Sequence, residues 1–101
     1  MIYITQLIYI IEGQENVFDQ FEAVAIPAIA RYNGQMLFRL RPGKEAYIES
    51  SIEQPFEIHL VSFETENDLS NFMQDEDRKR FLHLKERSIS AVLLIKGSKI
   101  S

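Results

Sequence analysis

The segment from Ile2 to Ile11 constrains the fold most, because it predicts a β-strand that is apolar on both faces. Side chains of a strand alternate between its two faces. One face here holds Ile2, Ile4, Ile8 and Ile10, and the other holds Tyr3, Leu7, Tyr9 and Ile11. Such a strand lies centrally in a sheet that is covered on both sides. The rest of the chain predicts helices for one side only. The second cover must therefore come from elsewhere, most simply from another copy of the chain.

Length and composition indicate one globular domain spanning residues 1–101. A net charge of -4 argues against a nucleic acid or an anionic membrane as the partner. The chain has no cysteine, which excludes disulfides, thiolate metal sites and a thiol nucleophile. The apolar first segment follows no basic residue and is shorter than the roughly 20 residues that span a bilayer. We therefore expect a cytoplasmic protein.

The first half of the chain predicts a long helix and then a strand. Apolar residues recur at helical spacing from Glu15 to Tyr32, and Pro27 within this segment predicts a kink near residues 23–26. Asn33 and Gly34 tolerate a positive φ and predict the end of the helix. The next predicted strand, residues 35–41, places Met36, Phe38 and Leu40 on one face and its polar residues on the other.

The second half predicts two more strands with helices between them. Residues 44–54 predict a loop, with a short extended piece at 46–49, and residues 56–63 predict a strand. Thr65 and Asp68 have the spacing of a capping box, so a helix begins at Glu66 and buries Leu69, Phe72 and Met73. Asp75 predicts the cap of a further helical piece that ends near Arg87. Residues 88–96 predict the last strand.

The order of these elements, βαββαβ, is typical of the ferredoxin-like fold of the α+β class. This topology predicts an antiparallel sheet with the first and third strands at its centre and both helical regions on one face. The opposite face is then exposed and apolar, which on soluble proteins usually marks an interaction site.

Three motifs resemble the dimeric α/β-barrel superfamily, which includes antibiotic-biosynthesis-type monooxygenases, and within it a family of small uncharacterised bacterial proteins. Residues 25–34 resemble that family's proline-bearing helix and Tyr-Gly-Gly turn, residues 63–65 its strand-ending Phe, and residues 94–97 its final strand. The resemblance implies two sheets packed face to face in a homodimer, with a cavity in each subunit. Asn33 stands where the family usually has Gly. The superfamily's monooxygenases use Asn, Trp and His, and this chain has no Trp.

His59 and His83 are the two histidines, which excludes a metal site built from several imidazoles within one chain. His59 lies within a predicted strand and either points into a cavity as a general base or packs as a hydrogen-bonded core residue. We expect His83 to be structural or exposed. We expect no metal and no cofactor, since the four glycines stand apart and form no phosphate-binding loop.

Two arginines and three further polar residues are candidate ligand contacts. Arg39 and Arg41 share a strand face and hold a carboxylate or enolate if that face lines the cavity. Otherwise they protect an edge strand from aggregation. Tyr9 and Tyr32 offer phenol groups near the cavity, although buried tyrosines more often pack with a hydrogen-bonded hydroxyl. Asn33 is a further candidate ligand contact.

These residues leave three functions open. The first is a homodimer that binds a small organic molecule between sheet and helices. The second is a cofactor-independent monooxygenase acting on an enolisable aromatic substrate, with His59 as the base and Arg39, Asn33 or Tyr32 stabilising the anion. The third is a structural dimer without a ligand. The residues do not decide whether the protein is an enzyme.

Overall fold

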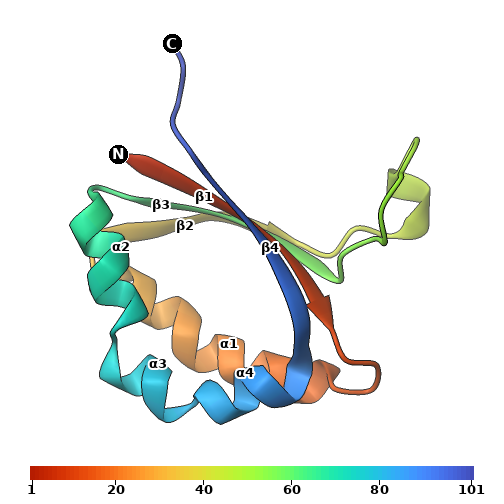
Figure 1. Cartoon of the computed structure of the whole chain (residues 1–101), viewed down its shortest axis with the longest axis horizontal. Coiled ribbons are helices and arrows are strands. Elements are labelled where there is room, and N and C mark those ends of the chain that lie inside the picture. The colour runs from red at the N-terminus through yellow and green to blue at the C-terminus, as the bar shows by residue number, and fades with distance from the viewer.

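The computed structural model describes all residues, 1–101, and contains the predicted βαββαβ order with the second helical region divided into three short helices. Its elements are β1 (Ile2–Ile10), α1 (Glu15–Ala30), β2 (Gly34–Leu40), the 3₁₀ helix η1 (Lys44–Ala46), β3 (Glu57–Phe63), α2 (Glu66–Met73), α3 (Glu76–Arg80), α4 (Leu82–Ser88) and β4 (Ile89–Gly97). All four helices lie on one side of the sheet (Figure 1). The ferredoxin-like α+β prediction is confirmed.

The four strands form one antiparallel sheet in the order β2-β3-β1-β4, with β1 and β3 at its centre as predicted. Pairing of Ile4 with Val61 and of Gln6 with His59 sets the register between β1 and β3. Paired residues share a face, because strands alternate in step. These four residues face the helices.

Strand β2 departs from the predicted alternation. The β2–β3 register shifts between Met36 and Phe38, so Met36 pairs with Val61 whereas Phe38 pairs with Leu60. An extra residue in one strand reverses the face of every residue beyond it. The prediction that Met36 and Phe38 share a face is therefore wrong. Arg39 pairs with His59 and lies on the helix-facing side.

Helix α1 continues through Pro27 and ends at Ala30, two residues before the predicted end. Asn33 adopts a φ of 57° in the turn that follows, as its sequence position predicts. The apolar face of α1 is buried against the sheet and α4, with Phe18, Phe21, Ala25, Ala28 and Ile29 all below a tenth exposed.

The capping-box prediction is confirmed at the start of α2. Thr65 Oγ1 accepts a hydrogen bond from Asp68 N at 3.1 Å, and Asp68 Oδ2 accepts one from Thr65 N at 3.2 Å. The prediction that α2 buries Leu69, Phe72 and Met73 holds only in part, because Leu69 and Phe72 pack partly buried against the core cluster and Met73 stays 41% exposed.

The predicted single helix after Asp75 is two helices. Asp75 Oδ2 caps α3 by accepting from Arg78 N at 2.8 Å, and the chain leaves helical geometry at Phe81 before α4 begins. Leu84 of α4 is buried in the core, and Leu82 packs against the same cluster. The extended piece predicted at residues 46–49 is absent, and residues 44–46 form η1 instead. Gly43 and Glu45 there form a local turn with no strand to pair with.

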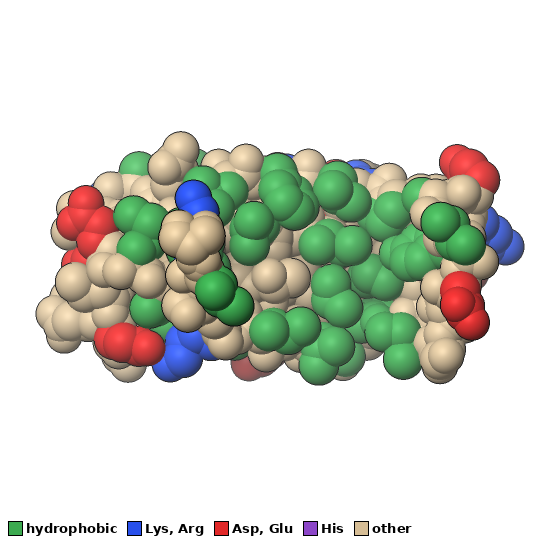
Figure 2. Space-filling view, turned by 90° about the horizontal axis from the view of Figure 1, so that it is seen from above, with side chains coloured by type: hydrophobic (Ala, Val, Ile, Leu, Met, Phe, Trp, Pro, Cys, Tyr) green, Lys and Arg blue, Asp and Glu red, His purple; other side chains and the backbone are tan.

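The sheet face opposite the helices is apolar and open. Its side chains come from all four strands, among them Phe38, Leu40, Leu7, Leu93 and Ile95. Phe38 is 45% exposed and Leu93 is 48% exposed. Figure 2 shows this face covered by hydrophobic side chains. No helix of the structure combines the length and the hydropathy needed to cross a membrane.

Candidate ligand-binding site

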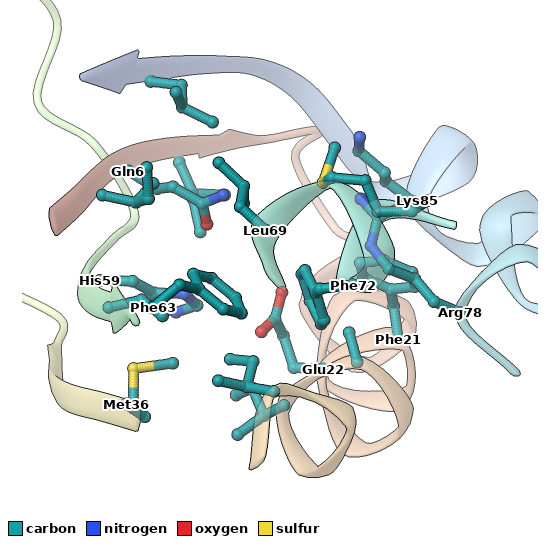
Figure 3. A pocket seen from close by; sticks show the side chains of 18 of the residues that line it. Gln6, Phe21, Glu22, Met36, His59, Phe63, Leu69, Phe72, Arg78 and Lys85 are labelled. Atoms are coloured by element: carbon teal, nitrogen blue, oxygen red, sulfur yellow. Dashed lines mark hydrogen bonds between the residues drawn. The ribbon is translucent and has the colours of Figure 1, made fainter. Parts of the chain in front are cut away.

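A cavity lies between the helix-facing side of the sheet and the helices. Its volume is about 80 Å³, several times the 10–15 Å³ that one water requires. Fourteen of its 19 lining residues are hydrophobic. The polar ones come from opposite walls, with Gln6 and His59 on the sheet and Glu22, Arg78 and Lys85 on the helices (Figure 3). An apolar cavity with a few converging polar groups is the usual form of a small-molecule site.

Glu57 organises the sheet wall of the site. Its carboxylate is 1% exposed and accepts hydrogen bonds from Arg39 Nη2 at 3.0 Å, from Arg41 Nε at 2.6 Å and from His59 Nε2. Burial alone would raise the pKa of this carboxyl, but the bonds from His59 and Arg41 hold the pKa below its usual value. Glu57 is therefore an anion buried beneath two guanidinium groups.

His59 is 2% exposed and lines the cavity. Its Nε2 is committed to Glu57, so the proton of the neutral ring lies on that nitrogen and Nδ1 is left as an acceptor. Nε2 is the one ring nitrogen of His59 with a hydrogen bond to the protein. Burial lowers the pKa of His59 against the opposing effect of Glu57. The neutral imidazole is thus the favoured form, and it can accept a proton from a molecule in the cavity.

Glu22 projects from α1 into the centre of the cavity (Figure 3). It is 7% exposed and makes no ion pair within 4.0 Å. Burial, and then the negative charge of Glu57, raise the pKa of Glu22 to about 7. The side chain is therefore partly protonated near neutral pH, and in its protonated form it can donate a hydrogen bond.

Glu22, Glu57 and His59 each place one potential ligand atom within 4.8 Å of the others, so they are also a possible cation site. Arg39 and Arg41 already neutralise Glu57, and a metal ion would have to displace these guanidinium groups or share the carboxylate with them. The charge around the cluster therefore disfavours a metal ion.

Arg78 and Lys85 bring two positive charges to the helix wall. Arg78 is 9% exposed and its guanidinium lies 5.5 Å from the ring of Phe72, with one long bond to the Met73 carbonyl at 3.4 Å. Burial lowers the pKa of both Arg78 and Lys85. Neither side chain has a carboxylate within 4.0 Å.

The predicted arginines lie beside the cavity rather than in its lining. Arg39 and Arg41 line a second, more open groove between β2 and α1, together with Asp19 and Pro27. Arg41 Nη2 bonds Asp19 Oδ1 at 2.6 Å. Glu22 lines both the groove and the cavity, so it lies at the partition between them.

Tyr32, Asn33 and Tyr9 also lie outside the cavity lining. The Tyr32 hydroxyl donates to Asp75 at 2.7 Å, and Asn33 Nδ2 donates to Asp68 at 3.2 Å. These bonds connect the end of α1 to the starts of α3 and α2. The Tyr9 hydroxyl donates to the carbonyl of Glu53 and ties the long β2–β3 connection to the sheet. His83 is exposed, as expected.

Sequence reasoning missed Glu22, Arg78 and Lys85. Glu22 carried a signal, because it lies one residue after Phe21 within the apolar stripe of a helix, at a position that packing buries. Arg78 and Lys85 fall in a charge-rich stretch that is typical of a solvated helix face. Only the packing of α3 and α4 against the rest of the fold shows that these two side chains line the cavity.

Comparison with known proteins identifies others that have the same fold. No protein-family model matches the chain, and no curated protein matches it in sequence. A protein of unknown function from Rhodopseudomonas palustris has a similar structure, with a TM-score of 0.81 at 9% identity over 99% of this chain and 82% of that one. A proposed antibiotic biosynthesis monooxygenase from Nitrosomonas europaea matches with a TM-score of 0.74 at 8% identity over the whole of both chains.

This chain has the same fold as these two proteins. An uncharacterised NIPSNAP domain protein from Burkholderia xenovorans matches as well, with a TM-score of 0.70 at 6% identity over 100% of this chain and 96% of that one. The resemblance inferred from the sequence motifs is therefore confirmed at the level of the fold. Because one fold hosts many activities, function must be argued from the cavity itself.

Proposed function

We propose that this protein is a homodimer that binds a small organic molecule in the cavity between its sheet and helices. The observation that carries the proposal is the cavity itself, which is apolar over most of its lining yet receives Glu22, His59 and Gln6 at its centre. Polar atoms that reach into an apolar cavity are satisfied there by a ligand or by water. A structural dimer without a ligand would instead have side chains filling this space.

The open apolar face of the sheet supports the second copy. Its hydrophobic side chains form a continuous surface over the strands (Figure 2). Monomeric proteins rarely leave such a surface in water, and a twofold axis lets one apolar sheet cover another. A second copy would supply the cover that the apolar outer face of β1 requires.

Ligand binding is tested by filling the cavity. Ala25 lines the cavity from α1, whereas Ala30 is exposed at the end of the same helix. In a thermal-shift screen of aromatic acids and quinols we expect a compound that raises the melting temperature of the wild type and of Ala30→Met but not of Ala25→Met. His59→Gln, which replaces the imidazole with an amide and does not fill the cavity, should weaken the same compound. Retention of full binding in both cavity variants would contradict the proposal.

Dimerisation is tested on the open sheet face. Leu93→Lys places a charge on this face, on the edge strand β4 beside Leu7, and Ile48→Lys places one in the exposed β2–β3 connection. Sedimentation at micromolar concentration should give a dimer for the wild type and for Ile48→Lys, and a monomer for Leu93→Lys. A folded wild-type monomer at that concentration would overturn the homodimer.

A cofactor-independent monooxygenase is the second candidate, and the His59–Glu57 pair favours it. A neutral His59 beside a fixed carboxylate can take a proton from an enolisable aromatic substrate, and the resulting carbanion would react with dioxygen. A ring CH₂ then becomes a carbonyl, and the second oxygen atom leaves as water. We expect substrate-dependent oxygen uptake to disappear in His59→Ala and to persist in His83→Ala. Equal uptake by both variants would exclude this role of His59.

A further inference from the structure

The helix wall of the cavity carries positive charge that the protein does not neutralise. Arg78 is more than nine-tenths buried, and its only polar side-chain contact is the 3.4 Å bond to the Met73 carbonyl. Lys85 is half-buried beside it and has no ion pair. A buried guanidinium without an anion is unfavourable, so this pair of cations calls for a negatively charged partner.

No carboxylate of the chain forms an ion pair with either cation. Asp75 caps α3 one turn before Arg78. Its Oδ1 accepts hydrogen bonds from Arg31 and Tyr32, and its Oδ2 accepts one from the backbone N–H of Arg78. Glu57 is committed to Arg39, Arg41 and His59 on the opposite wall. Glu22 is the remaining acid, and its charge acts on both Arg78 and Lys85 without an ion pair. Burial raises its pKa to about 7, so Glu22 is only partly ionised near neutral pH and balances at most one of the two cations.

We infer that the cavity binds a monoanion, specifically a carboxylate on a small apolar body, with the carboxylate between Arg78 and Lys85 and the body against the apolar sheet wall. Figure 3 shows Arg78 and Lys85 together on one side of the cavity, with His59 and Phe63 on the other and Glu22 between them. Two cations face one acid that supplies at most one negative charge, so a single further negative charge balances them, and the hydrophobic lining suits an aromatic ring or a short aliphatic chain. This inference rests on the proposed function and names its ligand class.

The inference also assigns ligand selection to residues other than Arg39 and Arg41, the arginines that the sequence suggested. Arg39 and Arg41 are already paired with Glu57 and Asp19, so they have little electrostatic capacity left for a ligand anion. Arg78 and Lys85 have that capacity. The unpaired helix-wall cations would thus distinguish an acid from its neutral analogue.

A matched pair of ligands tests this selection. The probes are 4-ethylbenzoate and its neutral amide, 4-ethylbenzamide, with binding to the full chain measured by calorimetry or ligand-observed NMR at fixed ionic strength. We expect the wild type to bind the acid about tenfold tighter than the amide or more. Arg78→Met, which keeps an apolar stem and removes the charge, should lose this preference while retaining the amide affinity. Arg80→Gln, which changes an exposed arginine of the same helix, should retain the preference.

Three outcomes separate the two proposals. Equal affinity of the wild type for acid and amide would overturn the anion inference and leave a cavity that binds uncharged molecules. An acid preference that survives in both Arg78→Met and Lys85→Gln would overturn the role of these two residues. If neither probe binds and the wider screen of acids and quinols finds no ligand that Ala25→Met blocks, the proposed function fails and the anion inference fails with it.

Discussion

Glu57 and His59 lie two residues apart on β3, on the same face, and His59 Nε2 is hydrogen-bonded to a Glu57 carboxylate oxygen. The pairing follows from strand geometry, because residues i and i+2 project to the same side. It fixes the tautomer of His59 and leaves Nδ1 as the acceptor of a side chain that lines the cavity. Any chemistry of this site that needs a base depends on this relationship.

The first prediction concerns the ionisation of His59. Burial lowers its pKa below the usual 6.5, and Glu57 opposes that effect. We expect nitrogen-resolved NMR to show a neutral ring protonated on Nε2 at neutral pH, with a midpoint below 6.5. Glu57→Gln removes the opposing charge and should lower the midpoint further. His83→Gln leaves a single histidine and so secures the assignment. A midpoint that rises in Glu57→Gln would contradict this account.

The second prediction compares the two carboxylates that bind Arg41. Glu57 is buried and Asp19 is half-exposed, yet both accept from the same guanidinium at 2.6 Å. Glu57→Gln leaves two arginines short of a buried anion and should lower the free energy of unfolding by about 3 kcal/mol. Asp19→Asn breaks a surface pair and should cost less than about 1 kcal/mol. Urea denaturation measures both. Similar losses would show that burial does not govern this network.

The third prediction concerns pH and Glu22. Its pKa is about 7 in the folded protein and 4.5 in the unfolded chain. Between these values the folded state binds more protons, so the contribution of Glu22 to stability is complete below 4.5 and is lost as the pH rises through about 7. Glu22→Gln removes this dependence. At about pH 8 it should be more stable than the wild type by on the order of 2 kcal/mol, with little difference in acid.

Denaturation of both proteins across the pH range measures the Glu22 effect. Glu49→Gln, which changes an exposed acid in the β2–β3 connection, is the control and should track the wild type throughout. If Glu22→Gln and the wild type differ by the same amount at every pH, Glu22 does not titrate between 4.5 and about 7.

The sequence predicts the order of the elements well because each one has a strong local signal. The capping box at Thr65 and the two-sided apolar pattern of β1 are read directly from residue types and spacing. The prediction from sequence fails where an extra residue changes the face of a strand, or where a break ends one helix and begins another. The register shift after Met36 and the break at Phe81 have no local signature, and the register shift reverses the face of the β2 residues that follow it.

The residues of the candidate site are predictable only in part, because some of them have a local sequence signal and others do not. His59 stands out as the only histidine in a strand, and its position in the cavity lining follows from the pairing with Gln6. Glu22, Arg78 and Lys85 come from three helices, and charged residues on helices usually face water. Only tertiary packing distinguishes these three from the exposed acids and bases around them.

The last prediction concerns the turn that brings β2 beneath α1. A Cβ added to Gly34 would lie 2.6 Å from Ile29 Cγ2 and 2.7 Å from Phe63 Cε1, so alanine at this position forces core side chains apart. Gly34→Ala should lower the free energy of unfolding by about 1 to 3 kcal/mol. Gly97→Ala is the matched control at the end of β4, where a Cβ meets nothing within 4 Å, and should change stability by less than about 0.5 kcal/mol. Thermal and urea denaturation compare the two. Equal effects would mean that β2 and α1 can separate without loss, and the helix wall of the cavity would then not be rigidly held.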